Sequence, residues 1–419
     1  MTETGNPPKH GGRKAAMSFI LIAVLIDMVS IGLIIPVLPP LVGTFTQSAS
    51  EHTLAQLAVA AAFGLANFFG SPILGGLSDR FGRRKVMLIG FSGLALSFFV
   101  TAMAQALWML VVVRLFSGAM QANAAVANAY VADITPPQDR AKRFGMLGAA
   151  FGMGFILGPV LGGLLGSIDL HLPFYVAGTL AVLNWLYGYF VLPESLPVER
   201  RRPFEWRKAS PWQALGRLRD LRGVGALVYV IGLSSLAQLV LHSTWVLYNT
   251  YKFGWGPFEN GMSLFAVGVL AVLVQGVFLK HILKRISAAR LVLIGLCTAV
   301  LTNVLWGLAT EGWMMYAAMF VNVLSYAAGP ALQGQISSAA DARTQGETMG
   351  TLSSLNSLAA VVAPVLGLGL MWLTAELPHS DWRFGAPFFF CAVLQALSLV
   401  LAWRHFSRVR ANAPVVPAS

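Results

Sequence analysis

The sequence predicts an all-α integral membrane protein with twelve transmembrane helices in two pseudo-symmetric six-helix bundles. Apolar residues make up 56% of the 419 residues and charged residues only 11%, whereas a soluble globular domain carries roughly a quarter charged residues. The mean hydropathy is +0.69. Apolar runs recur along the chain, each long enough for the ~20 residues that a membrane span requires. Because the hydrocarbon core offers the backbone no hydrogen-bond partners, such runs are expected to form helices.

Six apolar runs precede a polar stretch and six follow it. The first six spans are predicted over Met17–Leu41, Leu54–Leu77, Val86–Ala104, Leu107–Ala132, Phe144–Gly166 and Pro173–Leu192. The second six are predicted over Val224–Tyr248, Met262–Leu283, Leu291–Ala309, Trp313–Ser337, Met349–Thr374 and Phe384–Phe406. The resulting domains are a tail over 1–16, a bundle over 17–192, a linker over 193–222, a bundle over 223–406 and a tail over 407–419.

The positive charge of the chain follows from membrane topology. The formal charge is +12, with 29 Lys and Arg residues, and nearly all of them fall in the loops and tails of one side. This asymmetry predicts that both termini and the central linker lie in the cytoplasm. We expect the protein to lie in the inner membrane of the cell. No nucleic-acid partner is needed to explain the charge. The expected partners are the lipid bilayer, protons and a small-molecule substrate, and we expect the protein to function as a monomer.

The linker contains an amphipathic pattern. Trp212, Leu215, Leu218 and Leu221 recur at helical spacing among arginines, which is typical of a helix lying on the membrane surface. A flexible basic linker that only fixes the topology is the alternative.

Two charged side chains lie deep within predicted spans, where charges usually mark function. Asp27 lies about ten residues, or roughly 15 Å, from the cytoplasmic end of the first span, and Arg114 lies in the fourth span at a similar depth. Burial and a nearby opposite charge act in opposite directions on the protonation of an acid. A helix movement could therefore switch the protonation of Asp27, which predicts proton coupling. A permanently ionised pair that only locks two helices together is the alternative reading.

Uncharged polar and aromatic side chains at similar depth are candidates for a substrate cavity near the middle of the membrane. They are Asn67, Gln121, Asn123, Gln238, His242, Trp245, Tyr326 and Gln333. Each could equally serve as a hydrogen bond between helices. No cluster of His, Cys, Asp and Glu with the spacing of a metal site occurs, and no nucleophile with a matching base is evident. We therefore expect that the protein is not an enzyme and needs no metal or organic cofactor. We expect a proton gradient to drive its activity.

The turn between the second and third spans reads Gly75-Gly-Leu-Ser-Asp-Arg-Phe-Gly-Arg-Arg-Lys85. In the fifth span, Gly154, Gly158, Gly162 and Gly166 recur every four residues, with Pro159 and Gly163 beside them. A helix face without side chains allows very close helix packing.

These residues carry a family resemblance. Gly75, Leu77, Asp79, Arg80, Gly82, Arg83 and Arg84 match, in order, the signature loop of the major facilitator superfamily. The resemblance implies a charge latch that closes the cytoplasmic side in one state, to which Asp133 and Arg140 would belong. Physically, Asp79 would suit the positive end of a helix beginning near Met349. The run Gly154–Gly163 resembles the fifth-helix signature of the antiporters in this superfamily, which favours export over uptake.

The resemblance narrows to the tetracycline/proton antiporters. It is carried by Ile31–Pro39, Ala129–Thr135, Thr244–Leu247 with Phe253–Trp255, and Pro330–Gly334. Asp27, Arg114, Asp133 and Gln333 fall where that family has its first-helix acid, fourth-helix arginine, cytoplasmic acid and tenth-helix glutamine. The chain departs from the tetracycline pattern at Ser97, Ala299 and Ala271, where the family has two acids and a histidine. Either Asp27 carries the coupling alone, or the substrate is not metal-bound tetracycline.

The sequence thus predicts a proton-coupled exporter of an amphiphilic small molecule of the drug-efflux type, working by alternating access. A symporter or uniporter of the same superfamily for a metabolite, sugar or siderophore is the alternative.

Overall fold

The computed structural model describes residues 10–121, 123–136, 139–205, 225–339 and 345–411. All regular structure among these residues is helical, as the sequence predicts. Eleven helical segments are long and apolar enough to cross a membrane. The expected sixth span is also present as a helix, α8 (Leu172–Phe190) of 19 residues. The expected amphipathic helix over Trp212–Leu221 lies outside the described residues.

The chain divides into two compact units. The first comprises Met1–Leu41, Ala62–Ser210 and Pro257–Phe265, and the second comprises Val42–Ala61, Pro211–Gly256 and Ala266–Ser419. Helices α3 (Ala49–Phe81) and α11 (Pro257–Val272) therefore each begin in one unit and end in the other.

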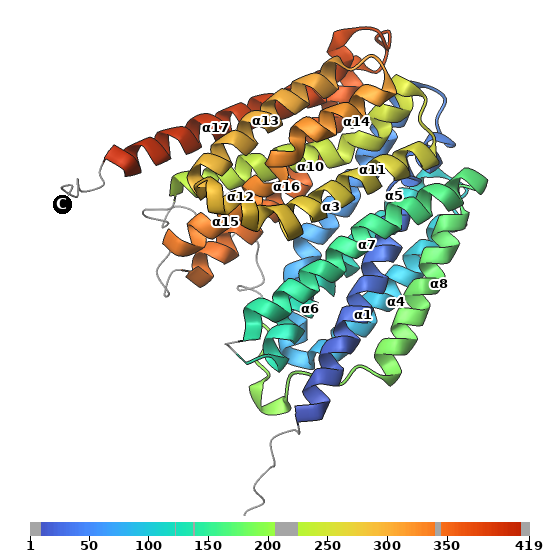
Figure 1. Ribbon diagram of the computed structural model, residues 1–419. Helices are drawn as coiled ribbons and strands as arrows, with labels where there is room; N and C mark the ends of the chain where they lie inside the picture. The colour runs from blue at the N-terminus through green and yellow to red at the C-terminus, as the bar shows by residue number, and fades with distance from the viewer. Residues whose placement is uncertain (1–9, 122, 137–138, 206–224, 340–344, 412–419) are drawn as a thin grey trace, which may run out of the picture. The chain divides into compact units, whose positions relative to one another are not determined.

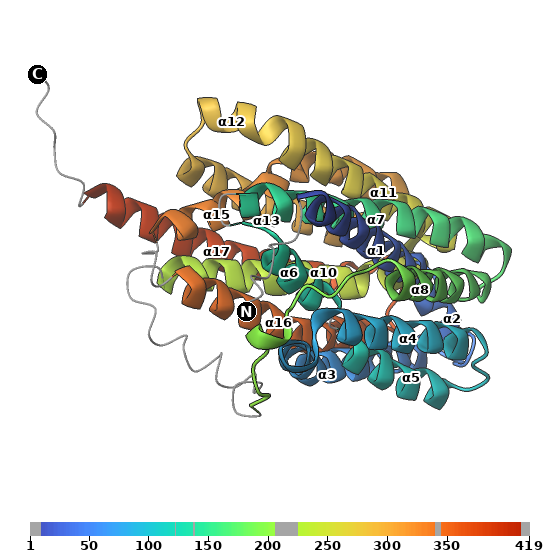
Figure 2. The same cartoon turned by 90° about the horizontal axis from the view of Figure 1, so that it is seen from below.

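The remaining helices of the first unit are α1 (His10–Ile34), α4 (Arg83–Ala102), α5 (Leu107–Met120), α6 (Asn123–Ile134), α7 (Arg140–Ile168), α8 and a short 3-10 turn over Val198–Arg200. Helices α1, α7 and α8 lie side by side (Figure 1). Helices α4 and α5 pack together beside the later part of α3 (Figure 2).

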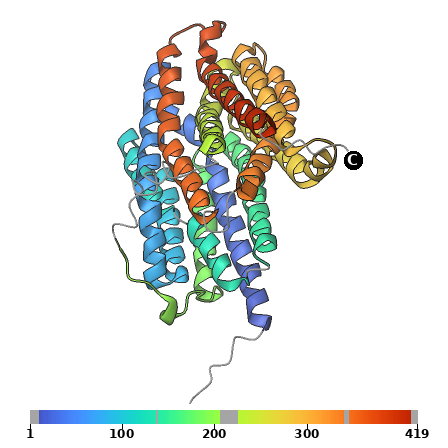
Figure 3. The same ribbon diagram turned by 90° about the vertical axis from the view of Figure 1, so that its left-hand side faces the viewer.

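The helices of the second unit are α2 (Leu38–Gly43), α10 (Gly225–Phe253), α12 (Leu279–Arg285), α13 (Ala288–Leu308), α14 (Gly312–Val321), α15 (Ser325–Ala339), α16 (Gln345–Thr374) and α17 (Ala386–Ala411). Helix α2 crosses the boundary, because residues 38–41 belong to the first unit and residues 42–43 to the second. Helix α10 lies between α16 and α17 (Figure 3). The core of the second unit is aromatic: Trp306, Tyr248 and Phe388 are among the largest fully buried side chains.

The glycine face of α7 packs directly on α1. A Cβ atom built on Gly158 would lie 2.5 Å from the Cα of Gly32, and one built on Gly162 would lie 2.0 Å from the carbonyl oxygen of Leu33. These are contacts of backbone with backbone, so the two helices approach as closely as two helices can. The close packing expected from the four-residue spacing is confirmed, and it fixes α1, which carries Asp27.

Four of the expected spans are interrupted within the described residues. The first turns at residues 35–37, between α1 and α2. The fourth span breaks at Gln121, between α5 and α6. The tenth contains the 3-10 turn η5 (Asn322–Leu324) between α14 and α15, and the eighth contains the π-helical segment η4 (Leu273–Phe278) between α11 and α12. Interruptions of this kind expose backbone groups and often occur at functional sites.

Candidate transport site

A cluster of buried and half-buried polar residues surrounds the break in the fourth span. We call Asp27, Asn67, Gln121 and Asn123 the polar cluster. The carboxylate of Asp27 is 4% exposed, and its Oδ1 accepts a hydrogen bond from Nδ2 of Asn123 at 3.3 Å. Asn123 is the first residue of α6. The acid on α1 is therefore linked directly to the interrupted helix.

Asn67 supports the other side of the break. A helix that ends leaves its last carbonyl groups without partners, and Nδ2 of Asn67 donates to the carbonyl oxygens of Gln121 at 2.9 Å and Gly118 at 3.4 Å. Both amide side chains thus hold the broken helix in place. In this conformation Asn67 satisfies backbone rather than pointing free into a cavity.

Glycines of α4 leave room for this arrangement. A Cβ atom on Gly90 would lie 2.1 Å from Oδ1 of Asn123, and one on Gly93 would lie 2.6 Å from Cγ of Met120. Because the α4 backbone presses against Asn123, the amide has little freedom to turn away from Asp27. The local glycine pattern therefore fixes the partner of the acid.

Arg114 lies on α5 and is 7% exposed. Among the described residues, its Nε and Nη2 atoms have no hydrogen-bond partner and it forms no ion pair with Asp27. Buried guanidinium groups are normally paired because isolated charges are costly to bury. The locked Asp27–Arg114 pair considered from the sequence is absent in this conformation, and Arg114 keeps donors free for an anionic or acidic group.

The candidate residues of the second unit have mixed surroundings. Gln238 and His242, one turn apart on α10, are exposed, and their side chains lie 3.2 Å apart. Trp245 is 3% exposed and packs edge-to-face on Trp306, with ring centroids 5.0 Å apart. It therefore belongs to the aromatic core in this conformation.

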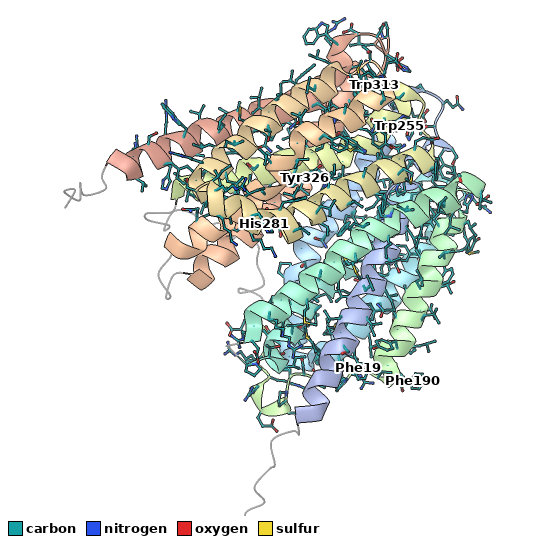
Figure 4. All side chains as sticks on the ribbon, in the orientation of Figure 1. Phe19, Phe190, Trp255, His281, Trp313 and Tyr326 are labelled. Carbon is teal, nitrogen blue, oxygen red and sulfur yellow. The ribbon has the colours of Figure 1, made fainter. Side chains whose placement is uncertain are left out.

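Two further candidates lie on the interrupted tenth span. Tyr326 is half-buried and follows the η5 turn, and Gln333 is exposed on α15. Figure 4 shows Tyr326 within the second unit, between Trp313 and His281. The substrate roles of these residues remain predictions.

A second cluster gathers at the turn between α3 and α4. We call Asp79, Arg83, Asp133 and Ser78 the gate cluster. The Arg83 guanidinium binds Asp79 at 2.6 Å and Asp133 at 3.1 Å, and its Nη1 donates to Oγ of Ser78 at 2.6 Å. One arginine thus joins the turn to the end of α6, as the family resemblance implies for Asp133.

The other expected gate residues contribute differently. Arg84 donates to the carbonyl oxygens of Gly188 and Tyr189 at the end of α8. Arg80 and Arg140 are exposed, and a Cβ atom on Gly75 would meet nothing within 4 Å. Gly82 adopts φ 101°, a backbone conformation that favours glycine.

Sequence reasoning missed the segment after α8. Ser195 donates through Oγ to Oδ2 of Asp133 at 3.2 Å, and Glu194 accepts a hydrogen bond from the backbone nitrogen of Arg83 at 2.8 Å. Their only sequence signal is a Pro-Glu-Ser run directly behind the sixth span.

The three residues that depart from the tetracycline pattern cannot titrate; Ser97 and Ala299 are buried and Ala271 is half-buried. Ser97 is 1% exposed and donates within its own helix to the carbonyl oxygen of Leu94 at 2.8 Å, and Ala299 is 3% exposed on α13. No group of three or more His, Cys, Asp and Glu that could hold a metal ion occurs in the part of the chain that the structure describes.

Comparison with known proteins places these clusters in a family context. The family model of the Major Facilitator Superfamily matches residues 20–364. The chain is 37% identical over 353 residues to the class C tetracycline resistance protein of Escherichia coli, covering 84% of this chain and 88% of that protein. It is 34% identical over 348 residues to the class D tetracycline resistance protein of Salmonella ordonez, covering 83% and 87%.

Solved structures show the same fold. A bacterial homolog of the human lysosomal transporter Spinster superposes with a TM-score of 0.73 at 15% identity, covering 98% of this chain and 100% of that chain. The human organic anion transporter TETRAN superposes with a TM-score of 0.69 at 23% identity, covering 95% and 100%. The fold class expected from the sequence is confirmed.

Proposed function

Because the chain belongs to the Major Facilitator Superfamily, and so is a transporter rather than an enzyme, we propose that it exports an amphiphilic small molecule in exchange for protons. The observation that carries the proposal is the buried acid Asp27, held by Asn123 at the break of the fourth span. A carboxyl group at this depth is costly to bury, and such groups within membrane spans usually have a function. The tetracycline resistance proteins that the chain resembles support export as the direction of transport.

In the proposed cycle, Asp27 takes a proton from outside and releases it to the cytoplasm, while two bundles alternate around a cavity near the middle of the membrane. The free guanidinium donors of Arg114 support a role in that step. A movement that brings Arg114 toward Asp27 would favour the carboxylate, and one that separates them would favour the neutral acid.

Substrate contacts are proposed at two interrupted spans, one in each unit, that occupy corresponding positions of the two halves. These are the fourth span, at Gln121, and the tenth span, at η5. Interrupted helices in corresponding positions of the two halves point to a transporter binding site, because their backbone ends can bind polar groups of a solute. Asn123, Tyr326 and Gln333 lie on these two spans and are the residues of first interest.

The gate cluster is proposed to lie at the cytoplasmic face, with both chain termini on the same side. The excess of Lys and Arg in the loops of that side supports the orientation. The pairing of Arg83 with Asp79 and Asp133 supports a latch that must break and re-form during each cycle.

Tetracycline is the first compound to test, but we do not assign it. The absence of titratable groups at Ser97, Ala299 and Ala271 leaves two alternatives to test: coupling through Asp27 alone, or a substrate other than metal-bound tetracycline. The panel therefore includes tetracycline with and without Mg²⁺, fluoroquinolones, cationic biocides and siderophore-like compounds.

The deciding experiment measures proton release from energised everted vesicles that contain the wild type or Asp27→Asn. Asparagine keeps an acceptor for Asn123 but cannot titrate, so the local packing is preserved. Asp169→Asn is the matched control, because Asp169 is an exposed acid in the loop between α7 and α8. We expect one compound to collapse the pH gradient with the wild type and the control, and not with Asp27→Asn.

Two results would contradict the proposal. Equal proton release by wild type and Asp27→Asn would mean that Asp27 has only a structural role. Substrate accumulation in energised right-side-out vesicles alone would mean uptake, and so a symporter.

A further inference from the structure

We propose that Glu194 is a positioning residue of the transport cycle, which anchors the segment after α8 to the first turn of α4 and thereby sets Arg83 between Asp79 and Asp133. The inference rests on the proposed role of the gate cluster as a cytoplasmic latch. Glu194 lies outside the signature loop, 111 residues after Arg83 in the chain.

The Glu194 carboxylate caps a helix that has no cap of its own. Helix α4 begins at Arg83, and its N-cap residue is Gly82, which has no side chain to accept a hydrogen bond. Oε1 of Glu194 accepts from the backbone nitrogen of Arg83 at 2.8 Å. The first N–H groups of a helix lack partners within the helix and lie at its positive end, so a carboxylate there is doubly favourable.

The same oxygen also orders its own segment. Oε1 accepts from the backbone nitrogens of Ser195 at 3.0 Å and Leu196 at 3.1 Å. Three N–H groups thus converge on one charged acceptor, and hydrogen bonds to a charged group are stronger than neutral ones. The Glu194 side chain therefore connects the bend after α8 directly to the start of α4.

Gly82 makes the approach possible. A Cβ atom at Gly82 would lie 2.3 Å from Oε2 of Glu194, so the second carboxylate oxygen occupies the space of a missing side chain. Gly82 also has φ 101°, where residues with a side chain are strained. Gly82 thus allows both the backbone conformation of the turn and the close approach of the Glu194 carboxylate.

Side-chain contacts connect this anchor with the latch. Oγ of Ser195 donates to Asp133 at 3.2 Å, and the hydroxyl of Tyr130 donates to the carbonyl oxygen of Pro193 at 2.9 Å. The segment is therefore bound to α6 on one side and to α4 on the other. Arg83 is held through its backbone by Glu194 and through its guanidinium by Asp133, so release of the segment would disturb both ion pairs of Arg83.

The first measurement tests the anchor without using transport. Trypsin is added to everted vesicles, and cleavage after Arg201 is followed by mass spectrometry for the wild type, Glu194→Gln, Glu194→Ala and Glu199→Gln. Glu199 is an exposed acid of the same segment that makes no side-chain hydrogen bond or ion pair with the described residues. We expect cleavage to be roughly tenfold faster in Glu194→Ala than in the wild type, as for the loss of a helix cap. The increase in cleavage rate should be smaller in Glu194→Gln. Glu199→Gln should match the wild type.

The second measurement tests positioning of the latch through the kinetics of transport. Glu194→Gln should lower the maximal rate roughly tenfold while KM and substrate binding change by less than twofold, and Glu194→Asp should restore part of the rate. A merely structural role would instead lower protein yield and leave the rate per folded molecule unchanged.

The outcomes separate this inference from the proposed function. Cleavage of Glu194→Ala at the wild-type rate would overturn the anchor, and faster cleavage with an unchanged transport rate would overturn the positioning role. A wild type that moves no compound of the panel would count against the proposed function, while the cleavage comparison would still decide for or against the anchor.

Discussion

A methyl group added to the glycine face of α7 should separate two helices that now touch through their backbones. In Gly158→Ala, the new Cβ would lie 2.5 Å from the Cα and 2.8 Å from the carbonyl carbon of Gly32 on α1. Neither atom belongs to a side chain that could turn away. The two helices must therefore move apart locally.

The size of the movement follows from the distance. Ordinary van der Waals contact begins at 3.4 Å, so the present 2.5 Å requires a shift of about 0.9 Å. Overpacking of this kind typically destabilises a protein by about 1–3 kcal/mol. Gly148→Ala is the matched control, because Gly148 lies on the same helix and a Cβ there meets nothing within 4 Å. In that open position alanine should stabilise the helix by about 0.5–1 kcal/mol relative to glycine.

The assay is thermal unfolding of the purified protein in detergent, followed by transport in reconstituted vesicles. We expect Gly158→Ala to unfold at a lower temperature than the wild type and Gly148→Ala to unfold at the same or a higher temperature. If both variants shift in the same direction by the same amount, helix propensity rather than the contact with Gly32 determines the effect. The reasoning from close packing would then be refuted.

Three further changes test the two polar clusters. Asn123→Ala removes the hydrogen bond to Asp27 and should shift the pH dependence of transport more than it changes KM; an unchanged pH profile with a raised KM would mean that Asn123 contacts substrate instead. Asp79→Asn removes one ion pair of Arg83 and should abolish transport while substrate binding, measured by calorimetry, stays nearly intact; a large loss of affinity would contradict a latch role. Asn67→Ala removes the side-chain donor to the carbonyl oxygen of Gln121, while that of Gly118 keeps the backbone N–H of Gln121, and should lower stability by about 1–3 kcal/mol; a protein that unfolds as the wild type does would show that water replaces the amide.

Contacts over long sequence separations show what individual candidate residues bind in this conformation. Asn123 has depth and polarity suited to a substrate ligand, but its amide binds Asp27, 96 residues away. Trp245 has the size of an aromatic wall, but it packs on Trp306 and Phe388 in the core of its unit. Composition and spacing give the depth of a side chain in the membrane, and they do not give the direction in which it points once neighbouring helices have packed.

The sequence by itself determined the helical class, the positions of the spans and the family. These follow from local physics, because a bilayer leaves the backbone of a long apolar run no choice except a helix, and because the charged turn at Asp79–Arg84 is contiguous in the chain. It also indicated the close packing of α7, since a four-residue glycine period creates a bare helix face. Only the tertiary structure decided that Asn123 holds Asp27, that Arg114 keeps free donors, and that Glu194 caps α4. These are pairings between distant segments, and they depend on which helix faces meet, which no periodicity within a single segment specifies.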